Sequence, residues 1–122
     1  MKTLKFVAFT FLICFLASCS KNISINRISV DVLNEDKEVV VGDQLMVDIL
    51  VRDDEGIDYL LIDIPVLAIN QKIQDYSENN KWKIEKHFLV SDTGKTGDFE
   101  IYFTLVDKGG EAYVEVETFT IK

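Results

Sequence analysis

The sequence is poor in the residues on which most catalytic and metal sites depend. Among its 122 residues it has one histidine, His87, and two cysteines, Cys14 and Cys19. Structural zinc sites take four cysteine or histidine ligands, so we expect no zinc. A Ser–His–Asp triad would have to use His87, and no nucleophile-elbow pattern is present. We therefore expect no catalytic activity, although the 21 acidic residues leave open, by number alone, the paired carboxylates of a small hydrolase.

Basic residues are scarce as well. The chain has 13 lysines and arginines against 21 aspartates and glutamates, a net charge of −8. Nucleic-acid phosphates and anionic lipid headgroups both attract a basic surface. We therefore expect neither nucleic-acid binding nor direct adsorption to anionic headgroups.

Long apolar runs are rare, and the main one lies near the N-terminus. Lys2 and Lys5 precede residues 6–17, which are apolar apart from Thr10. This run is shorter than the roughly 20 residues that a membrane-spanning helix needs. A positive start, a short apolar middle and small residues before a cleavage point are typical of an export signal.

The end of this run adds a chemical feature. Leu16-Ala17-Ser18-Cys19 resembles the lipobox of bacterial lipoproteins. The resemblance implies that the Cys19 thiol carries a diacylglycerol, that residues 1–18 are removed as the signal peptide, and that the new N-terminus is acylated. Several acyl chains suit this role because one myristoyl-sized chain anchors only marginally. Ser20, where an aspartate would favour the inner membrane, points to the outer membrane and leaves its face open.

Cleavage before Cys19 would also change the composition. It would remove Lys2, Lys5 and Cys14, and leave 104 residues with 11 basic and 21 acidic side chains, a net charge of −10. A disulfide within the mature chain would then be impossible. The remaining length is typical of one domain. We expect a lipidated tether at residues 19–27 and one domain at residues 28–122, attached to the membrane through lipid alone.

Alternation of apolar and polar residues dominates the expected domain and predicts half-buried strands. Apolar side chains recur at every second position in residues 28–32, 39–41, 45–51, 60–64, 82–88 and 99–105, with Lys86 as the one exception. Pro65 should end its strand because it cannot donate a ladder hydrogen bond. Residues 66–76 fit either a short crossover strand or a helical turn.

The last strand changes its phase. Val114 and Val116 are followed by Phe119 and Ile121 at positions of opposite parity. A bulge near Glu117 and Thr118 would return both pairs to the inward face.

About seven short strands separated by turns predict an all-β fold, an antiparallel β-sandwich. The turn residues resemble those of immunoglobulin-like domains in bacterial envelope proteins, and the resemblance covers residues 28–122. It depends on four segments: Gly42-Asp43, Asp53-Asp54-Glu55-Gly56, Gly97-Asp98-Phe99 and Asp107-Lys108-Gly109-Gly110. It implies a fold far more than a function.

In such a sandwich, several acidic loops share one pole. Asp53, Asp54, Glu55 and Asp107 would meet there with Asp75 and Glu78. Calcium prefers carboxylate oxygens, so a structural or accessory lipoprotein that binds calcium at these loops is one alternative. The other reading is a solvated acidic turn. The tether should emerge at this same pole.

Tyrosines provide the other candidate site. If Leu60, Ile101 and Val114 face inward, then four side chains face outward on neighbouring strands: Tyr59, Leu61, Tyr102 and Tyr113. Clustered tyrosines beside an apolar residue are typical of a protein interface or a sugar platform, although cross-strand pairing alone also uses them. The favoured function is therefore binding of an envelope protein or glycan through a sheet face.

Overall fold

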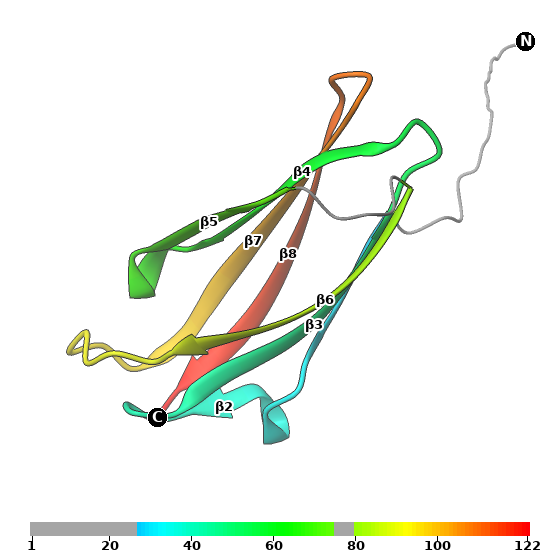
Figure 1. Ribbon diagram of the computed structural model, residues 1–122. Helices are drawn as coiled ribbons and strands as arrows, with labels where there is room; N and C mark the ends of the chain where they lie inside the picture. Colours follow the sequence, from blue (N-terminus) through cyan, green and yellow to red (C-terminus); the bar gives the residue numbers. More distant parts are fainter. Residues whose placement is uncertain (1–26, 75–79) are drawn as a thin grey trace, which may run out of the picture.

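The alternating segments form the strands of two facing sheets (Figure 1). The computed structural model describes residues 27–74 and 80–122, and no helix in these ranges is long and apolar enough to cross a membrane. The elements in chain order are β1 (Ile28–Val32), the 3-10 turn η1 (Glu35–Lys37), β2 (Glu38–Val39), β3 (Gln44–Arg52), β4 (Ile57–Ile64), the 3-10 turn η2 (Pro65–Leu67), β5 (Ile69–Ile73), β6 (Lys81–Leu89), β7 (Gly97–Asp107) and β8 (Ala112–Ile121).

Strand pairing defines a sheet of three strands and a sheet of five. The first has the order β1-β3-β6 and is antiparallel. The second has the order β2-β8-β7-β4-β5, in which β2 and β8 run parallel and the other neighbours antiparallel. The predicted all-β, immunoglobulin-like sandwich is therefore confirmed, with eight strands among the described residues.

The core lies between the sheets and is built from the inward side chains of both. Leu45, Val47 and Val51 of β3 are fully buried from one side, and Ile62 and Phe103 from the other. Burying a side chain of this size stabilises the fold by about 1.5–3 kcal/mol. The domain therefore holds together by apolar packing.

The segment left open by the sequence, residues 66–76, holds a short helical turn and then a strand that pairs back onto β4 in the same sheet and does not cross over. β4 ends before Pro65, as predicted, and η2 follows as a single 3-10 turn. Ala68 adopts a left-handed conformation with φ of 56° and reverses the chain. β5 then returns antiparallel to β4, with Ile69 opposite Ile64.

The strand expected over residues 39–41 is shorter than predicted. β2 ends at Val39, and Val40 and Val41 are 46% and 52% exposed. Asp43 explains this end: its backbone N–H donates to the Val40 carbonyl, and its carboxylate accepts from the Val40 N–H at 3.0 Å. The chain therefore turns before Val41 can extend the strand.

The predicted bulge in the last strand is wrong. β7 and β8 pair without a register shift from Gly97 opposite Ile121 to Val106 opposite Ala112. Val114 therefore points outward, away from the core, rather than inward as expected. The inward positions between the two ends of β8 hold Glu115 and Glu117 instead.

Acidic residues can occupy these inward positions because β8 is an edge strand over most of its length. β2 pairs only with Thr120 and Ile121. Glu115 is exposed at this edge, and Glu117 binds the Lys37 ammonium of η1 at 3.0 Å. Charged residues that point inward at an edge also discourage the addition of a further strand.

Candidate functional site

The outward side chains of β4, β7 and β8 form an apolar surface on the five-stranded sheet. Leu61, Thr104 and Val114 occupy one row across the three strands. Tyr102 and Val116 are opposite each other in the next row. Val114 and Val116 are 61% and 43% exposed. We call this surface the five-strand face and define it by Tyr59, Leu61, Tyr102, Val114 and Val116.

The structure brings together three of the four residues predicted for an outward binding face. Tyr59, Leu61 and Tyr102 lie at outward positions of the same sheet and are half-buried. Tyr113 does not belong with them. Because the β7–β8 register has no bulge, the Tyr113 ring lies on the inward side and packs against the core.

Tyr113 has a structural role at the inner edge of the sandwich. The Arg27 guanidinium lies 4.3 Å from the centre of its ring. Its hydroxyl donates to the Glu111 carboxylate at 2.6 Å. This hydrogen bond, together with burial, raises the pKa of Tyr113 to about 12, although Arg27 acts in the opposite direction.

Sequence reasoning missed Val114 and Val116, which were assigned to the core. The signal that could have identified them is the unbroken alternation of residues 113–121. Tyr113, Phe119 and Ile121 share one parity with two acidic residues between them. The bulge was expected because it would turn Val114 and Val116 inward together with Phe119 and Ile121. At an edge strand, acidic side chains can hold the inward positions instead, and no bulge is needed.

The five-strand face has charged groups of opposite sign at its two ends. At one end, the Lys72 ammonium lies 4.3 Å from the centre of the Tyr59 ring, a cation–π contact. At the other end, the Tyr102 hydroxyl donates to the Glu100 carboxylate, and Asp63 lies opposite Tyr102 in the register. The hydrogen bond to Glu100 is the main cause that raises the pKa of Tyr102, and the charges of Glu100 and Asp63 add to it.

A hollow of about 380 Å³ adjoins the acidic end of the face. Tyr102 belongs to both surfaces, so the hollow continues the face toward η2. Seven residues line it: Pro65, Val66, Asp98, Phe99, Glu100, Tyr102 and Thr118.

The predicted acidic pole forms, and its buried carboxylates hold turns. Asp53 and Asp107 are 5% and 3% exposed. One Asp53 oxygen accepts from the Glu55 N–H at 2.9 Å, and Asp107 accepts from the Glu111 N–H at 2.9 Å. The Lys108 N–H donates to the Gly56 carbonyl and joins the two loops. Satisfied backbone amides account for the burial of both aspartates.

The calcium prediction gains no support from this pole. Asp54 and Glu55 are exposed there. Within residues 27–74 and 80–122, no three His, Cys, Asp or Glu side chains are grouped so that they could hold a metal ion. Asp75 and Glu78, expected to complete the acidic pole, lie outside the described residues, as does Cys19.

Residue 27, the first that the structure describes, lies at the acidic pole. Arg27 Nε binds the second Asp53 oxygen at 3.2 Å, and the Arg52 N–H donates to the Arg27 carbonyl. With the Tyr113 ring against its guanidinium, Arg27 connects the start of β1 to the β3–β4 turn and to β8.

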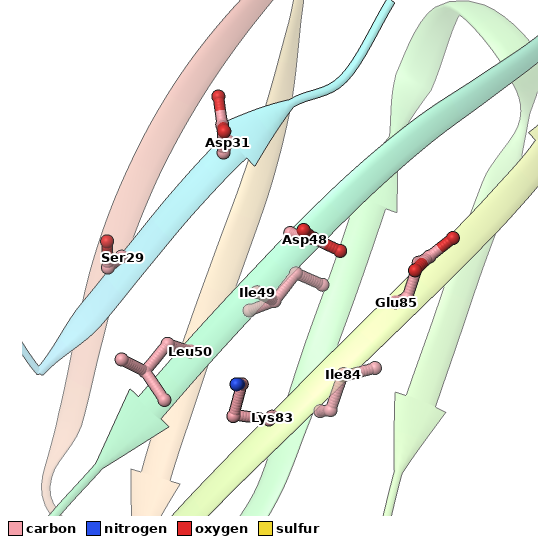
Figure 2. Close-up of a pocket in the computed structure, with 8 residues that line it drawn as sticks. All are labelled: Ser29, Asp31, Asp48, Ile49, Leu50, Lys83, Ile84 and Glu85. Atoms are coloured by element: carbon pink, nitrogen blue, oxygen red, sulfur yellow. The ribbon is translucent and has the colours of Figure 1, made fainter.

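The outer surface of the three-stranded sheet has a different chemistry (Figure 2). Asp31 on β1, Asp48 on β3 and Glu85 on β6 are directly opposite one another in the register. They line a hollow of about 430 Å³ beside Lys83. We call this surface the three-strand face and define it by Ser29, Asp31, Asp48, Leu50, Lys83 and Glu85.

His87 lies on the same outer surface and faces solvent, as predicted. Its ring nitrogen Nε2 is 2.7 Å from a Glu85 oxygen, and both side chains are exposed. The single histidine therefore belongs to a different sheet from the five-strand face.

Comparison with known proteins finds distant structural likeness only. No family model and no curated protein matches the sequence. A similar solved structure is the crystal structure of a Niemann-Pick type C2 protein from the Japanese carpenter ant, with 9% sequence identity and a TM-score of 0.47. The likeness covers 80% of this chain and 90% of that chain. The sheet topology described above defines the class, an immunoglobulin-like β-sandwich.

Proposed function

We propose that this protein is a lipid-anchored, non-catalytic module of the bacterial cell envelope that binds a partner protein through the five-strand face. The lipobox at residues 16–19 supports the anchor, because its cysteine is the residue that lipoproteins acylate. The exposure of Val114 and Val116 beside Leu61 supports the binding face. This exposure carries the proposal, since clustered apolar side chains on a surface mark interaction sites more often than single ones do.

The chemistry of the face favours a protein over a glycan. Sugar sites depend on aromatic rings and free hydrogen-bonding groups. Here the Tyr102 hydroxyl already binds Glu100, and Lys72 lies against the Tyr59 ring. Leu61, Val114 and Val116 offer aliphatic surface, which suits the apolar core of a protein interface with tyrosines around it.

The position of Arg27 supports the choice of this face over the acidic loops. A tether over residues 19–27 would span at most about 30 Å when extended. It would join the domain at the pole of Asp53 and Asp107, where Arg27 is held. That pole would hang next to the membrane, whereas the five-strand face lies along the side of the sandwich and stays accessible.

The anchor is tested by changing its cysteine. We expect Cys19→Ser to abolish incorporation of labelled palmitate in growing cells and to move the protein from the membrane fraction to the soluble fraction. Cys14→Ser is the matched control and should be acylated normally. Equal labelling of both variants would contradict the lipidation of Cys19.

The binding face is tested with two pairs of valines of similar exposure. We expect Val114→Ser with Val116→Ser to lose at least about nine-tenths of the partner cross-linked in intact cells, since central apolar contacts carry most interface energy. Val40→Ser with Val41→Ser, 46% and 52% exposed at the β2–β3 turn, should keep it. Both variants must melt like the wild type. Equal loss of the cross-linked partner in both pairs would contradict a binding role for the five-strand face. Retention of the wild-type protein on a purified envelope glycan would show that the ligand is a sugar.

A further inference from the structure

The carboxylates at the acidic end of the five-strand face are not in any ion pair of the described residues. In residues 27–74 and 80–122, the ion pairs use Asp53, Glu117, Glu85 and Glu38. Asp63, Glu100 and Asp98 are in none of them. Asp98 accepts from the Thr120 hydroxyl at 2.7 Å, and Glu100 accepts from Tyr102. These neutral donors leave the negative charge in place.

The hollow beside Tyr102 concentrates this charge. Its seven lining residues include Asp98 and Glu100 but no lysine or arginine. Asp63, half-buried, lies on the adjacent strand opposite Tyr102. Glu100 and Asp63 both raise the pKa of Tyr102, which agrees with a negative potential around its ring.

The opposite end of the face already holds its own cation. Lys72 is opposite Leu61 in the register, and its ammonium reaches the ring of Tyr59, which is two rows from the row of Tyr102 and Asp63. Two rows correspond to four residues along a strand, or about 13 Å. The face therefore presents a negative hollow, an aliphatic centre and a positive end in sequence along β4 and β7.

We infer that the partner is a protein segment that places a lysine or arginine in the hollow beside Tyr102 and lays apolar side chains on Leu61, Val114 and Val116. Three features fit such a cation: the carboxylates of Asp63 and Glu100, and the exposed part of the Tyr102 ring, whose face attracts cations. The charges at the two ends fix the direction of the segment. This inference rests on the proposed function and deepens it.

The test is a selection from a phage-displayed library of random peptides of about 12 residues, long enough to span the face. The full chain in detergent micelles serves as the bait. We expect enriched peptides to contain one lysine or arginine next to two or more apolar residues. Exchange of the basic residue for norleucine in an enriched peptide should weaken its Kd about threefold to tenfold, as for ion pairs at a partly exposed surface.

Variants of the chain test whether the hollow causes the preference for a basic residue in the peptide. Asp63→Asn with Glu100→Gln removes two charges and should weaken the same peptide about threefold to tenfold. The variant should also flatten the dependence of Kd on salt between about 50 and 500 mM NaCl. Asp48→Asn with Glu85→Gln removes two charges from the three-strand face and is the matched control, which should bind like the wild type.

The outcomes separate this inference from the proposed function. If enriched peptides need Val114 and Val116 but carry no basic residue, the inference is wrong and the binding role of the face is retained. The same holds if Asp63→Asn with Glu100→Gln binds the peptide as Asp48→Asn with Glu85→Gln does. If enriched peptides bind equally well to Val114→Ser with Val116→Ser, or if the library yields no binders, both the face and the inference are wrong.

Discussion

The two outer faces of the sandwich share a geometry and differ in chemistry. On the three-strand face, Asp31, Asp48 and Glu85 form a row straight across three neighbouring strands. On the five-strand face, the equivalent row holds Leu61, Thr104 and Val114. Like charges directly opposite one another on a sheet destabilise it, whereas cross-strand pairs that include β-branched side chains contribute about 0.2–1 kcal/mol each. The acidic row therefore opposes folding, and the apolar row adds a small amount to stability.

The difference between the two faces indicates which of them has a composition that a binding partner would account for. A row of carboxylates is well hydrated and opposes association with other acidic surfaces, so the three-strand face suits a surface kept in water. Val114 at 61% exposure leaves apolar area in water without any such benefit. The contrast therefore supports a binding role for the five-strand face, and variants placed at equivalent positions of both faces can test it.

The largest effect is expected from matched leucines. Leu61 and Leu50 are both half-buried leucines at outward positions, one on each face. Leu61→Glu should weaken partner capture at least about thirtyfold, because a charge at the centre of an apolar contact costs about 2 kcal/mol or more. Leu50→Glu should leave capture unchanged. A quantitative cross-linking titration measures both, and equal loss would remove the distinction between the faces.

A smaller and different effect is expected from Tyr113, which packs inward. Its pKa in the folded chain, about 12, lies above the value near 10 of a free tyrosine. The protonated Tyr113 hydroxyl therefore contributes to the free energy of unfolding. This contribution is complete below about pH 10 and is lost as the pH rises through about 12. Tyr113→Phe should flatten the fall in stability between these pH values.

The readout for Tyr113 is urea unfolding at a series of alkaline pH values, together with partner capture at neutral pH. Tyr113→Phe should capture the partner normally, because the ring lies on the inward side of β8. Loss of capture in this variant would return Tyr113 to the binding face.

The smallest effect is expected on the three-strand face. Asp48 lies between Asp31 and Glu85, so Asp48→Asn removes repulsion with both neighbours. We expect the free energy of unfolding to rise by about 0.2–1 kcal/mol at low salt and the gain to shrink at high salt. Thermal melts at two salt concentrations measure it. Destabilisation would show that the row has a favourable role in folding.

The fold followed from the sequence because period-two alternation is a local signal. Segments such as residues 45–51 have apolar side chains at every second position, and the buried side of β3 matches them. Pro65 ends β4 for a reason that also acts locally. Residues 66–76 could not be assigned, because the reversal depends on Ala68 in a left-handed conformation, which nothing in its neighbours requires.

The candidate site was predicted only in part, because the parity of β8 depends on tertiary structure. Whether Glu115 can point inward is decided by where β2 stops pairing, at Thr120, and not by β8 itself. That fact moves Val114 outward and Tyr113 inward. The charged ends of the five-strand face could not be predicted from the sequence either, because the contact of Lys72 with Tyr59 depends on the pairing of β4 with β5.

The most direct test of the five-strand face places a photoreactive amino acid at single positions in living cells. The account predicts a discrete cross-linked adduct when the probe replaces Val114, and none when it replaces Leu50 or Val41. The absence of an adduct at Val114, or the same adduct at all three positions, would contradict it.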